Sequence, residues 1–215
     1  MNLFAALVRR DVRRAYAGGG ALWPVAFFLL VATLFPFAVG PDSALLGRVA
    51  AGVVWTAALL AALLPVERLV APDLESGVLD QLAVRATPMA LVATAKVAAH
   101  WLAFTPPLML ATLVAAGLLG MSGRTLALVE LGLLIGTPGL AALGVATGAL
   151  VAGLRGAGAV AGLVMLPLAV PLLIFGAGAV EQGAGAYKLL GAVSLLLLAG
   201  APFVAAAAIR AGMGD

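Results

Sequence analysis

Charged residues are scarce in this chain of 215 residues, and cysteine is absent from it. Only 10% of the residues are Asp, Glu, Lys or Arg, whereas 64% are hydrophobic. A water-soluble domain carries about 25% charged residues, so this composition excludes one and predicts a protein that folds in a lipid bilayer. The absence of cysteine excludes disulfides, thiolate catalysis and cysteine-ligated metals.

Histidine is also rare, since His100 is the only one in the sequence. One imidazole is too few for a self-contained histidine metal site, so we expect no metal centre. The net charge of +3 would point to nucleic acid in a soluble chain. Here the basic residues stand between apolar runs, which membrane topology explains better, and we expect no nucleic-acid partner.

Six apolar runs are long enough for the roughly 20 residues that a spanning helix needs. They are Ala21–Val39, Val49–Val66, Val97–Gly123, Leu131–Leu154, Gly156–Val180 and Leu189–Ile209. The predicted fold class is an all-α integral membrane protein with six transmembrane helices, forming a single transmembrane domain over residues 1–215. The third run, extended back to Met89, would measure about 50 Å against a hydrocarbon core of about 30 Å. We predict that this helix breaks at Pro106 and Pro107.

Residues 1–16 are expected to form an interfacial helix. Its apolar side holds Leu3, Phe4, Leu7 and Val8, and its arginines, Arg9, Arg10, Arg13 and Arg14, lie mostly elsewhere. Such a helix lies at the headgroups, where its arginines meet anionic lipid. Asp11 falls on the apolar side and weakens the pattern after two turns.

The distribution of Lys and Arg predicts the orientation. Nine stand on the side of the N-terminus, namely Arg9, Arg10, Arg13, Arg14, Arg68, Arg85, Lys96, Arg155 and Arg210. Three, Arg48, Arg124 and Lys188, stand on the other side. By the positive-inside rule, both termini are predicted to be cytoplasmic.

The segment from Glu67 to Pro88 is the largest polar stretch between apolar runs. Pro72 and Asp73 favour a helix start, because proline is tolerated in the first turn and a carboxylate there stabilises the unpaired amides. The expected helix places Leu74, Val78, Leu79 and Leu82 on one face, and Asp73, Glu75, Ser76, Asp80 and Gln81 elsewhere. We therefore expect an amphipathic helix at the membrane surface; the alternative is a plain solvated loop.

This segment resembles the acidic, glycine-containing cytoplasmic loop of type-2 ABC-exporter permeases. In that family the loop carries a coupling helix that docks on the nucleotide-binding subunit. The resemblance implies ATPase-coupling roles for Glu67, Arg68, Asp73, Glu75, Gly77 and Asp80. The chain has no Gly-x-x-x-x-Gly-Lys-Ser/Thr phosphate loop, so ATP would be hydrolysed by a separate subunit.

Ionisable residues within the apolar runs are candidate substrate contacts. Lys96 and His100 lie one turn apart on one helix face, with Trp101 adjacent. The alternatives are that Lys96 snorkels to the surface, that Trp101 packs, and that Glu130 pairs with Arg124 at the outer interface. His100 lies about 6 Å deeper than Lys96, so its imidazole needs a partner: a helix neighbour, an iron or an anionic substrate.

Small residues recur at the spacing that allows close helix packing. The pairs are Gly132 with Gly136, Gly144 with Gly148, and Gly158 with Gly162. Packing within the chain explains such pairs better than a subunit interface does.

The chain as a whole resembles the CcmB family, the haem-exporter permease subunit of cytochrome c maturation. The resemblance runs from about Val8 to Arg210 and is carried by blocks in the same order: Leu34-Phe35-Pro36 with Gly40-Pro41; Trp55 with Ala57 to Ala61; Glu67-Arg68-Leu69; Asp73-Leu74, Gly77, Leu79 and Gln81-Leu82; Ala95-Lys96-Val97 with Ala99-His100-Trp101; Gly136-Thr137-Pro138; and Leu166-Pro167-Leu168 with Pro171 to Gly176. The segment after Val180 departs from the family in being short and glycine-rich.

This resemblance implies a non-enzymatic inner-membrane subunit of an ABC complex. Its implied partners are an ABC ATPase subunit that binds ATP, haem-handling membrane subunits and a periplasmic haem chaperone. Haem is then the cargo, with Lys96, His100 and Trp101 as candidate contacts, and no bound cofactor is expected. Two alternatives stay open: a type-2 ABC permease for a lipid or glycan, and an ion-coupled carrier or intramembrane enzyme that uses Lys96, His100 and Glu130.

Overall fold

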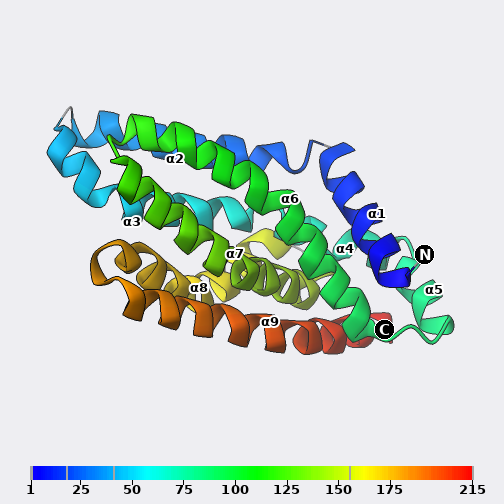
Figure 1. Cartoon of the computed structure of the whole chain (residues 1–215). Coiled ribbons are helices and arrows are strands. Elements are labelled where there is room, and N and C mark those ends of the chain that lie inside the picture. The colour runs from blue at the N-terminus through cyan, green and yellow to red at the C-terminus, as the bar shows by residue number, and fades with distance from the viewer. Residues whose placement is uncertain (1, 18, 41, 155, 215) are drawn as a thin grey trace.

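The computed structural model describes residues 2–17, 19–40, 42–154 and 156–214. Within these ranges the chain forms helices joined by short connections (Figure 1). They are α1 (Leu3–Ala17), α2 (Leu22–Val39), α3 (Ser43–Leu63), the 3-10 turn Val66–Arg68, α4 (Ala71–Glu75), α5 (Val78–Val84), α6 (Met89–Leu118), α7 (Gly123–Val151), α8 (Ala157–Gln182) and α9 (Ala184–Met213). Met1, Pro41 and Arg155, used in the predictions above, lie outside the described residues.

Six of these helices are long and apolar enough to cross a membrane: α2, α3, α6, α7, α8 and α9. This confirms the predicted all-α membrane fold. The chain reverses direction between successive long helices, and α1, α4, α5 and both termini lie at one end, which we call the terminal end (Figure 1). The opposite end carries the connections that follow α2, α6 and α8.

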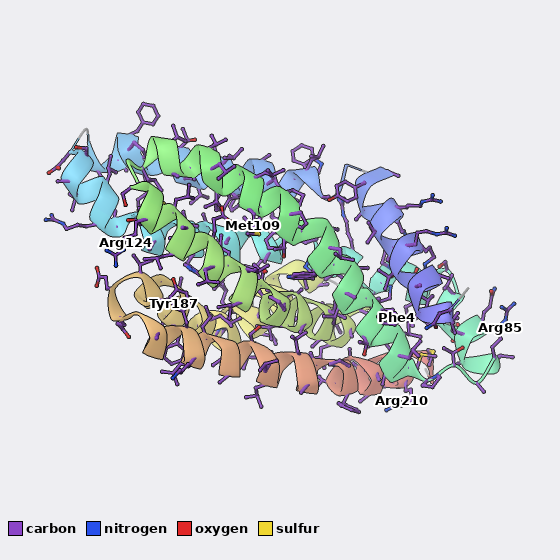
Figure 2. The ribbon with its side chains drawn as sticks, viewed as in Figure 1. Phe4, Arg85, Met109, Arg124, Tyr187 and Arg210 are labelled. Atoms are coloured by element: carbon purple, nitrogen blue, oxygen red, sulfur yellow. The ribbon has the colours of Figure 1, made fainter. Side chains whose placement is uncertain are left out.

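Basic residues gather at the terminal end. Arg85 and Arg210 lie there, whereas Arg124 lies at the opposite end (Figure 2). The arginines of α1 and Arg68, which precedes α4, are also at the terminal end. The described basic residues that were assigned to the side of the N-terminus therefore lie together at the terminal end, and Arg124, assigned to the other side, lies at the opposite end.

The predicted break in the third span is wrong, because α6 continues from Met89 to Leu118 with Pro106 and Pro107 inside it. Each proline leaves the carbonyl four residues earlier without its helical N–H. For Pro107 this is the carbonyl of Ala103, which accepts a hydrogen bond from the Tyr16 hydroxyl at 3.4 Å. A side chain from α1 thus replaces a missing backbone donor, as membrane helices with proline require.

The core of the opposite half is built around Trp55 of α3, which is 1% exposed. Gly132 and Gly136 of α7 and Gly176 of α8 face its indole ring, and a Cβ on Gly176 would overlap the ring. The glycines let α3, α7 and α8 approach closely, which favours helix association where no hydrophobic force acts between lipid-facing surfaces.

The paired glycines serve packing within the chain, as expected. Gly132 and Gly136 face Trp55, Gly144 faces His100, Gly148 faces the carbonyl of Val66, and Gly158 faces Glu67. A Cβ on Gly148 would lie 2.6 Å from the Val66 oxygen, so this glycine sets the distance between α7 and the 3-10 turn. Gly162 is the exception, since a Cβ there would meet nothing within 4 Å.

Gly176→Ala is expected to destabilise the protein by about 1–3 kcal/mol, because the methyl group would overfill the space taken by the Trp55 indole. Gly162→Ala on the same helix is the matched control. It should leave stability unchanged or raise it by up to about 1 kcal/mol, because alanine favours a helix over glycine. The measurement is the thermal unfolding midpoint of the purified protein in detergent. Equal midpoints for the two variants would show that the Trp55 packing is not tight.

Candidate functional site

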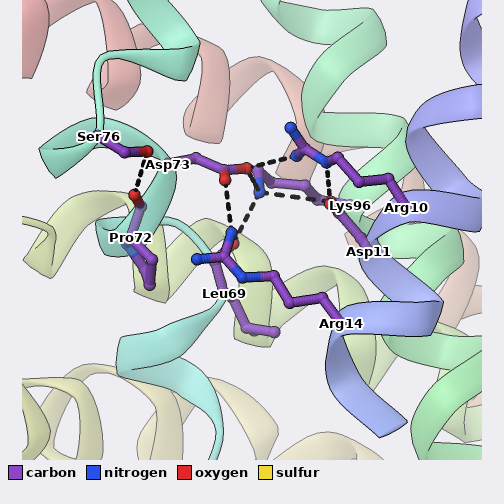
Figure 3. Close-up of polar contacts among 8 residues, drawn as sticks. All are labelled: Arg10, Asp11, Arg14, Leu69, Pro72, Asp73, Ser76 and Lys96. Carbon is purple, nitrogen blue, oxygen red and sulfur yellow. Dashed lines mark hydrogen bonds and ion pairs between the residues drawn. The ribbon is translucent and has the colours of Figure 1, made fainter. Parts of the chain in front are cut away.

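A cluster of charged side chains ties together three elements at the terminal end (Figure 3). Asp73 of α4 is 1% exposed and accepts hydrogen bonds from Arg10 Nη2 at 2.6 Å and Arg14 Nη1 at 2.8 Å. Lys96 of α6 donates to the same carboxylate. One acidic side chain therefore binds cations from α1 and from α6.

Asp11 completes this charge cluster. Its carboxylate pairs with Arg10 Nε at 2.7 Å and with Lys96 Nζ at 3.4 Å. Lys96 also donates to the carbonyl of Leu69 at 3.0 Å. Three cations thus meet two carboxylates, and each buried charge has several partners, as a low-dielectric site requires.

The cluster changes the pKa of Arg10, which is partly buried. Burial lowers the pKa of Arg10, but the hydrogen bond and charge of Asp11, together with those of Asp73, outweigh burial and raise it above its ordinary value. Arg10 therefore remains protonated at every physiological pH.

Two sequence-based expectations fail at this cluster. Asp73 was expected on the polar face of the coupling helix, but it is buried against α1 and α6. Lys96 does not snorkel, because it is 5% exposed and paired with Asp73 and Asp11. The reason in both cases is that opposite charges from distant segments meet, which repays part of the cost of burial.

The predicted coupling helix is two short helices. Gly77 separates α4 from α5 with a φ of 70°, a left-handed conformation that glycine adopts without strain. Pro72 and Asp73 do lie in the first turn of α4, as predicted. Gly77 therefore forms the turn between two helices and is not part of a helix interior.

The apolar face of this segment is confirmed. Leu79 is fully buried, and Leu74 and Leu82 pack beside it against α6 and α9. Glu75, Asp80, Gln81 and Arg85 are exposed, and Val84 is 88% exposed. Glu67 and Arg68, which precede α4, are also exposed. The α4–α5 segment is thus anchored on one side and presents a polar surface with both acidic and basic side chains on the other.

A cavity of about 570 Å³ lies beside the charge cluster, between α1, α2, the connection from α3 to α4, and the first half of α6. His100 and Phe104 line it, and their rings stack with centroids 5.8 Å apart. Trp101 points elsewhere, since its Nε1 donates to Thr137 on α7 at 3.2 Å. Of the three candidate contacts, Lys96 and His100 reach the cavity and Trp101 is a packing residue.

Two further expectations concern partners of buried polar groups. His100 Nε2 is buried without a hydrogen-bond partner among the described residues, so of the alternatives for His100 the bond from this atom to a helix neighbour is not formed. The expected Glu130–Arg124 pair is also absent from the part of the chain that the structure describes, where both Glu130 oxygens are buried and unpartnered beside Pro106 and Met109.

No three His, Asp or Glu side chains within the described ranges gather as a metal site would require.

Comparison with known proteins places this arrangement in a family. The model of the CcmB protein family matches residues 2–212. The chain belongs to the CcmB family. It is similar to heme exporter protein B of Bradyrhizobium diazoefficiens, with 44% identity over 99% of this chain and 100% of that protein. It is likewise 45% identical to heme exporter protein B of Rhodobacter capsulatus and 40% identical to that of Escherichia coli, over 97% of this chain and at least 98% of each relative.

The region matched by the family model includes every helix of the candidate site, namely α1, α4, α5 and α6. Sequence reasoning nevertheless missed Arg10, Asp11 and Arg14 as partners of Asp73 and Lys96. A signal was present, because Asp11 falls on the apolar side of its helix. A charged residue in that position predicts a buried partner elsewhere in the chain.

Asp73→Asn is expected to destabilise the protein by about 3–5 kcal/mol, because it leaves the buried ammonium of Lys96 with weaker partners. Glu75→Gln on the same helix is the control, and this exposed side chain should change stability by less than about 0.5 kcal/mol. Unfolding midpoints of both variants in detergent provide the comparison. An Asp73→Asn midpoint within one degree of the wild type would mean that the pairing contributes no net stability.

Proposed function

We propose that this chain is the permease subunit of an ABC complex that exports haem for cytochrome c maturation. The relatives' names support haem as the cargo. The observation that carries the coupling part of the proposal is the α4–α5 segment, which exposes Glu75, Asp80 and Arg85 on one side and whose Asp73 is tied to α1 and α6 on the other. The chain lacks a phosphate loop, so a separate ATPase subunit supplies the ATP hydrolysis.

The docking surface for this ATPase is the exposed side of the segment. Asp80 and Glu75 provide acidic groups that attract a basic partner surface, and Val84 provides an exposed apolar side chain at the tip. Glu67 and Arg68 extend this surface toward α3, and Gly77 forms the turn within the segment. Leu79, being buried, holds the segment to the spanning helices.

The charge cluster transmits motion from this surface. A displacement of α4 moves Asp73, and Asp73 holds Arg10 and Arg14 of α1 and Lys96 of α6. Because a buried carboxylate is costly without its cations, α1 and α6 move with α4 or the cluster rearranges as a unit. Coupling thus needs no contact between the ATPase and the spanning helices.

The remaining parts of the complex follow from the same proposal. Haem-handling membrane subunits and a periplasmic haem chaperone receive the cargo, and the chain lies in the bacterial inner membrane. Both termini and the α4–α5 segment face the cytoplasm, where ATP is present. The concentration of arginine at the terminal end supports this orientation.

Deletion of this chain is the experiment that tests the function. All c-type cytochromes should then lack covalent haem, which would distinguish haem export from transport of a lipid or glycan. Normal cytochromes in the deletion strain would contradict the proposal, and transport driven by a proton gradient in the purified chain alone would favour an ion-coupled carrier.

Complementation of that strain tests the coupling surface. Asp80→Lys should weaken ATPase co-purification and cytochrome maturation, because it reverses a charge on the exposed side. Gly77→Pro should have the same effect, since proline cannot adopt the φ of 70° found there. The matched control is Glu181→Lys, a reversal of an exposed charge at the opposite end. If both α4–α5 variants retain the ATPase and mature cytochromes normally, the segment is only a loop.

The orientation is tested by single cysteines, for which the cysteine-free chain is a clean background. A cysteine at the exposed position of Ser76 should react with an impermeant thiol reagent only after the cells are opened. A cysteine at Ser122, exposed at the opposite end, should react in cells whose outer membrane alone is permeable. Labelling of the Ser76 position before opening would reverse the orientation and remove the ATPase contact.

A further inference from the structure

The cavity at the terminal end is lined by more positive than negative side chains. Its volume of about 570 Å³ lies within the range of small-molecule sites, about 300–1,000 Å³. Arg14, Arg68 and Lys96 line it, and Asp11 is the acidic side chain among the lining residues. Most of the other lining residues are apolar. A ligand that fits this cavity carries negative charge on a partly apolar body.

Arg68 supplies positive charge that no carboxylate of the described chain neutralises. Lys96 is held by both carboxylates of the charge cluster, whereas Arg68 forms no ion pair with any described residue. The neighbouring Glu67 does not fill this role, because its carboxylate adjoins Gly158 of α8 and is absent from the cavity lining. An arginine left without a counter-ion in a mostly apolar cavity attracts an anion from outside the chain.

Arg14 has hydrogen-bond donors to spare on the same cavity. Its Nη1 donates to Asp73 at 2.8 Å, while the side chain is 56% exposed (Figure 3). A guanidinium carries five N–H donors in a planar fork, and a phosphate group accepts two of them side by side. Arg14 therefore binds a phosphate without giving up Asp73, and no ion pair of the charge cluster has to break.

The cavity lies at the level where spanning helices end. Trp23 is in the first turn of α2 and Leu64 directly follows α3, and both line the cavity. Trp23 is 70% exposed and Leu64 is 47% exposed. Tryptophan is enriched at the depth of the lipid headgroups, and basic pockets between spanning helices bind headgroups there. The cavity is thus open to the part of the bilayer in which phosphates are found.

We propose that this cavity binds the headgroup of one anionic phospholipid, with its phosphate between Arg68 and Arg14 and the start of an acyl chain along Trp23 and Leu64. A net negative lipid is favoured over a zwitterionic one, because Arg68 needs a counter-ion and a zwitterion brings a cation with its phosphate. The bound lipid joins α1 to the segment that precedes α4, next to the link made by Asp73. The inference concerns the bilayer rather than the cargo, so it does not depend on haem export.

Arg68→Gln should weaken phosphatidylglycerol binding about tenfold, because it removes a charge-assisted hydrogen bond. Arg68→Lys keeps the charge but not the fork, and it should lose less affinity. The matched control is Arg13→Gln on α1, an exposed arginine that is absent from the cavity lining. It should bind the lipid as the wild type does. Since Arg68 is exposed and forms no ion pair with a described residue, Arg68→Gln should keep the wild-type unfolding midpoint in the absence of lipid.

The experiment titrates phosphatidylglycerol into the purified full-length chain in a neutral detergent. Native mass spectrometry counts the bound lipids, and the thermal unfolding midpoint provides a second measurement, because a ligand that binds the folded state raises it. Phosphatidylcholine and inorganic phosphate are titrated in parallel. The expected result is one phosphatidylglycerol per chain, saturating at concentrations at which phosphatidylcholine is not retained, with a raised midpoint for the wild type and for Arg13→Gln.

Several results would overturn the proposal. They are phosphatidylglycerol uptake that does not saturate, equal affinities for Arg68→Gln and Arg13→Gln, and equal binding of phosphatidylcholine. Inorganic phosphate that raises the midpoint as much as phosphatidylglycerol would assign the cavity to a free anion and not to a lipid. The ATPase is absent from these titrations, so an effect of Arg68→Gln on ATPase docking does not enter them.

Discussion

The carboxylate of Asp73 is the interaction on which the terminal end depends. In a bilayer protein each buried charge must be neutralised locally, because no water is available to solvate it. Asp73 does this for Lys96 of α6 and at the same time binds Arg10 and Arg14 of α1. A helix that would otherwise lie loosely at the membrane surface is thereby fixed to a spanning helix and to the α4–α5 segment.

A second constraint, close backbone packing, determines the other half of the molecule. Helices in lipid gain little from burying apolar side chains against each other, so association depends on fitting small residues around large ones. The Trp55 indole fills the space left by Gly136 and Gly176 on two neighbouring helices. The two halves therefore differ physically: one is held by charge pairs, the other by steric fit.

The position of the charge cluster connects two surfaces of the terminal end that bear on the proposed function. The charge cluster lies between the exposed face of α5 and the cavity that holds His100, so one set of ion pairs adjoins both surfaces. Tyr16 extends the same connection along α6, where it bonds to the carbonyl of Ala103 that Pro107 leaves free. Helix α1 is thus attached to α6 by ionic and by neutral hydrogen bonds.

The sequence by itself determined the six long apolar helices, the N-terminal helix, the apolar face of α5 and the family, because these depend on composition, periodicity and the order of local motifs. Only the tertiary structure decided which charges meet. Asp73 and Arg14 are 59 residues apart, and no local pattern records their pairing. It also decided that α6 stays continuous, since the donor that rescues its proline comes from α1. Pairings of this kind depend on contacts between distant segments, which local preferences do not encode.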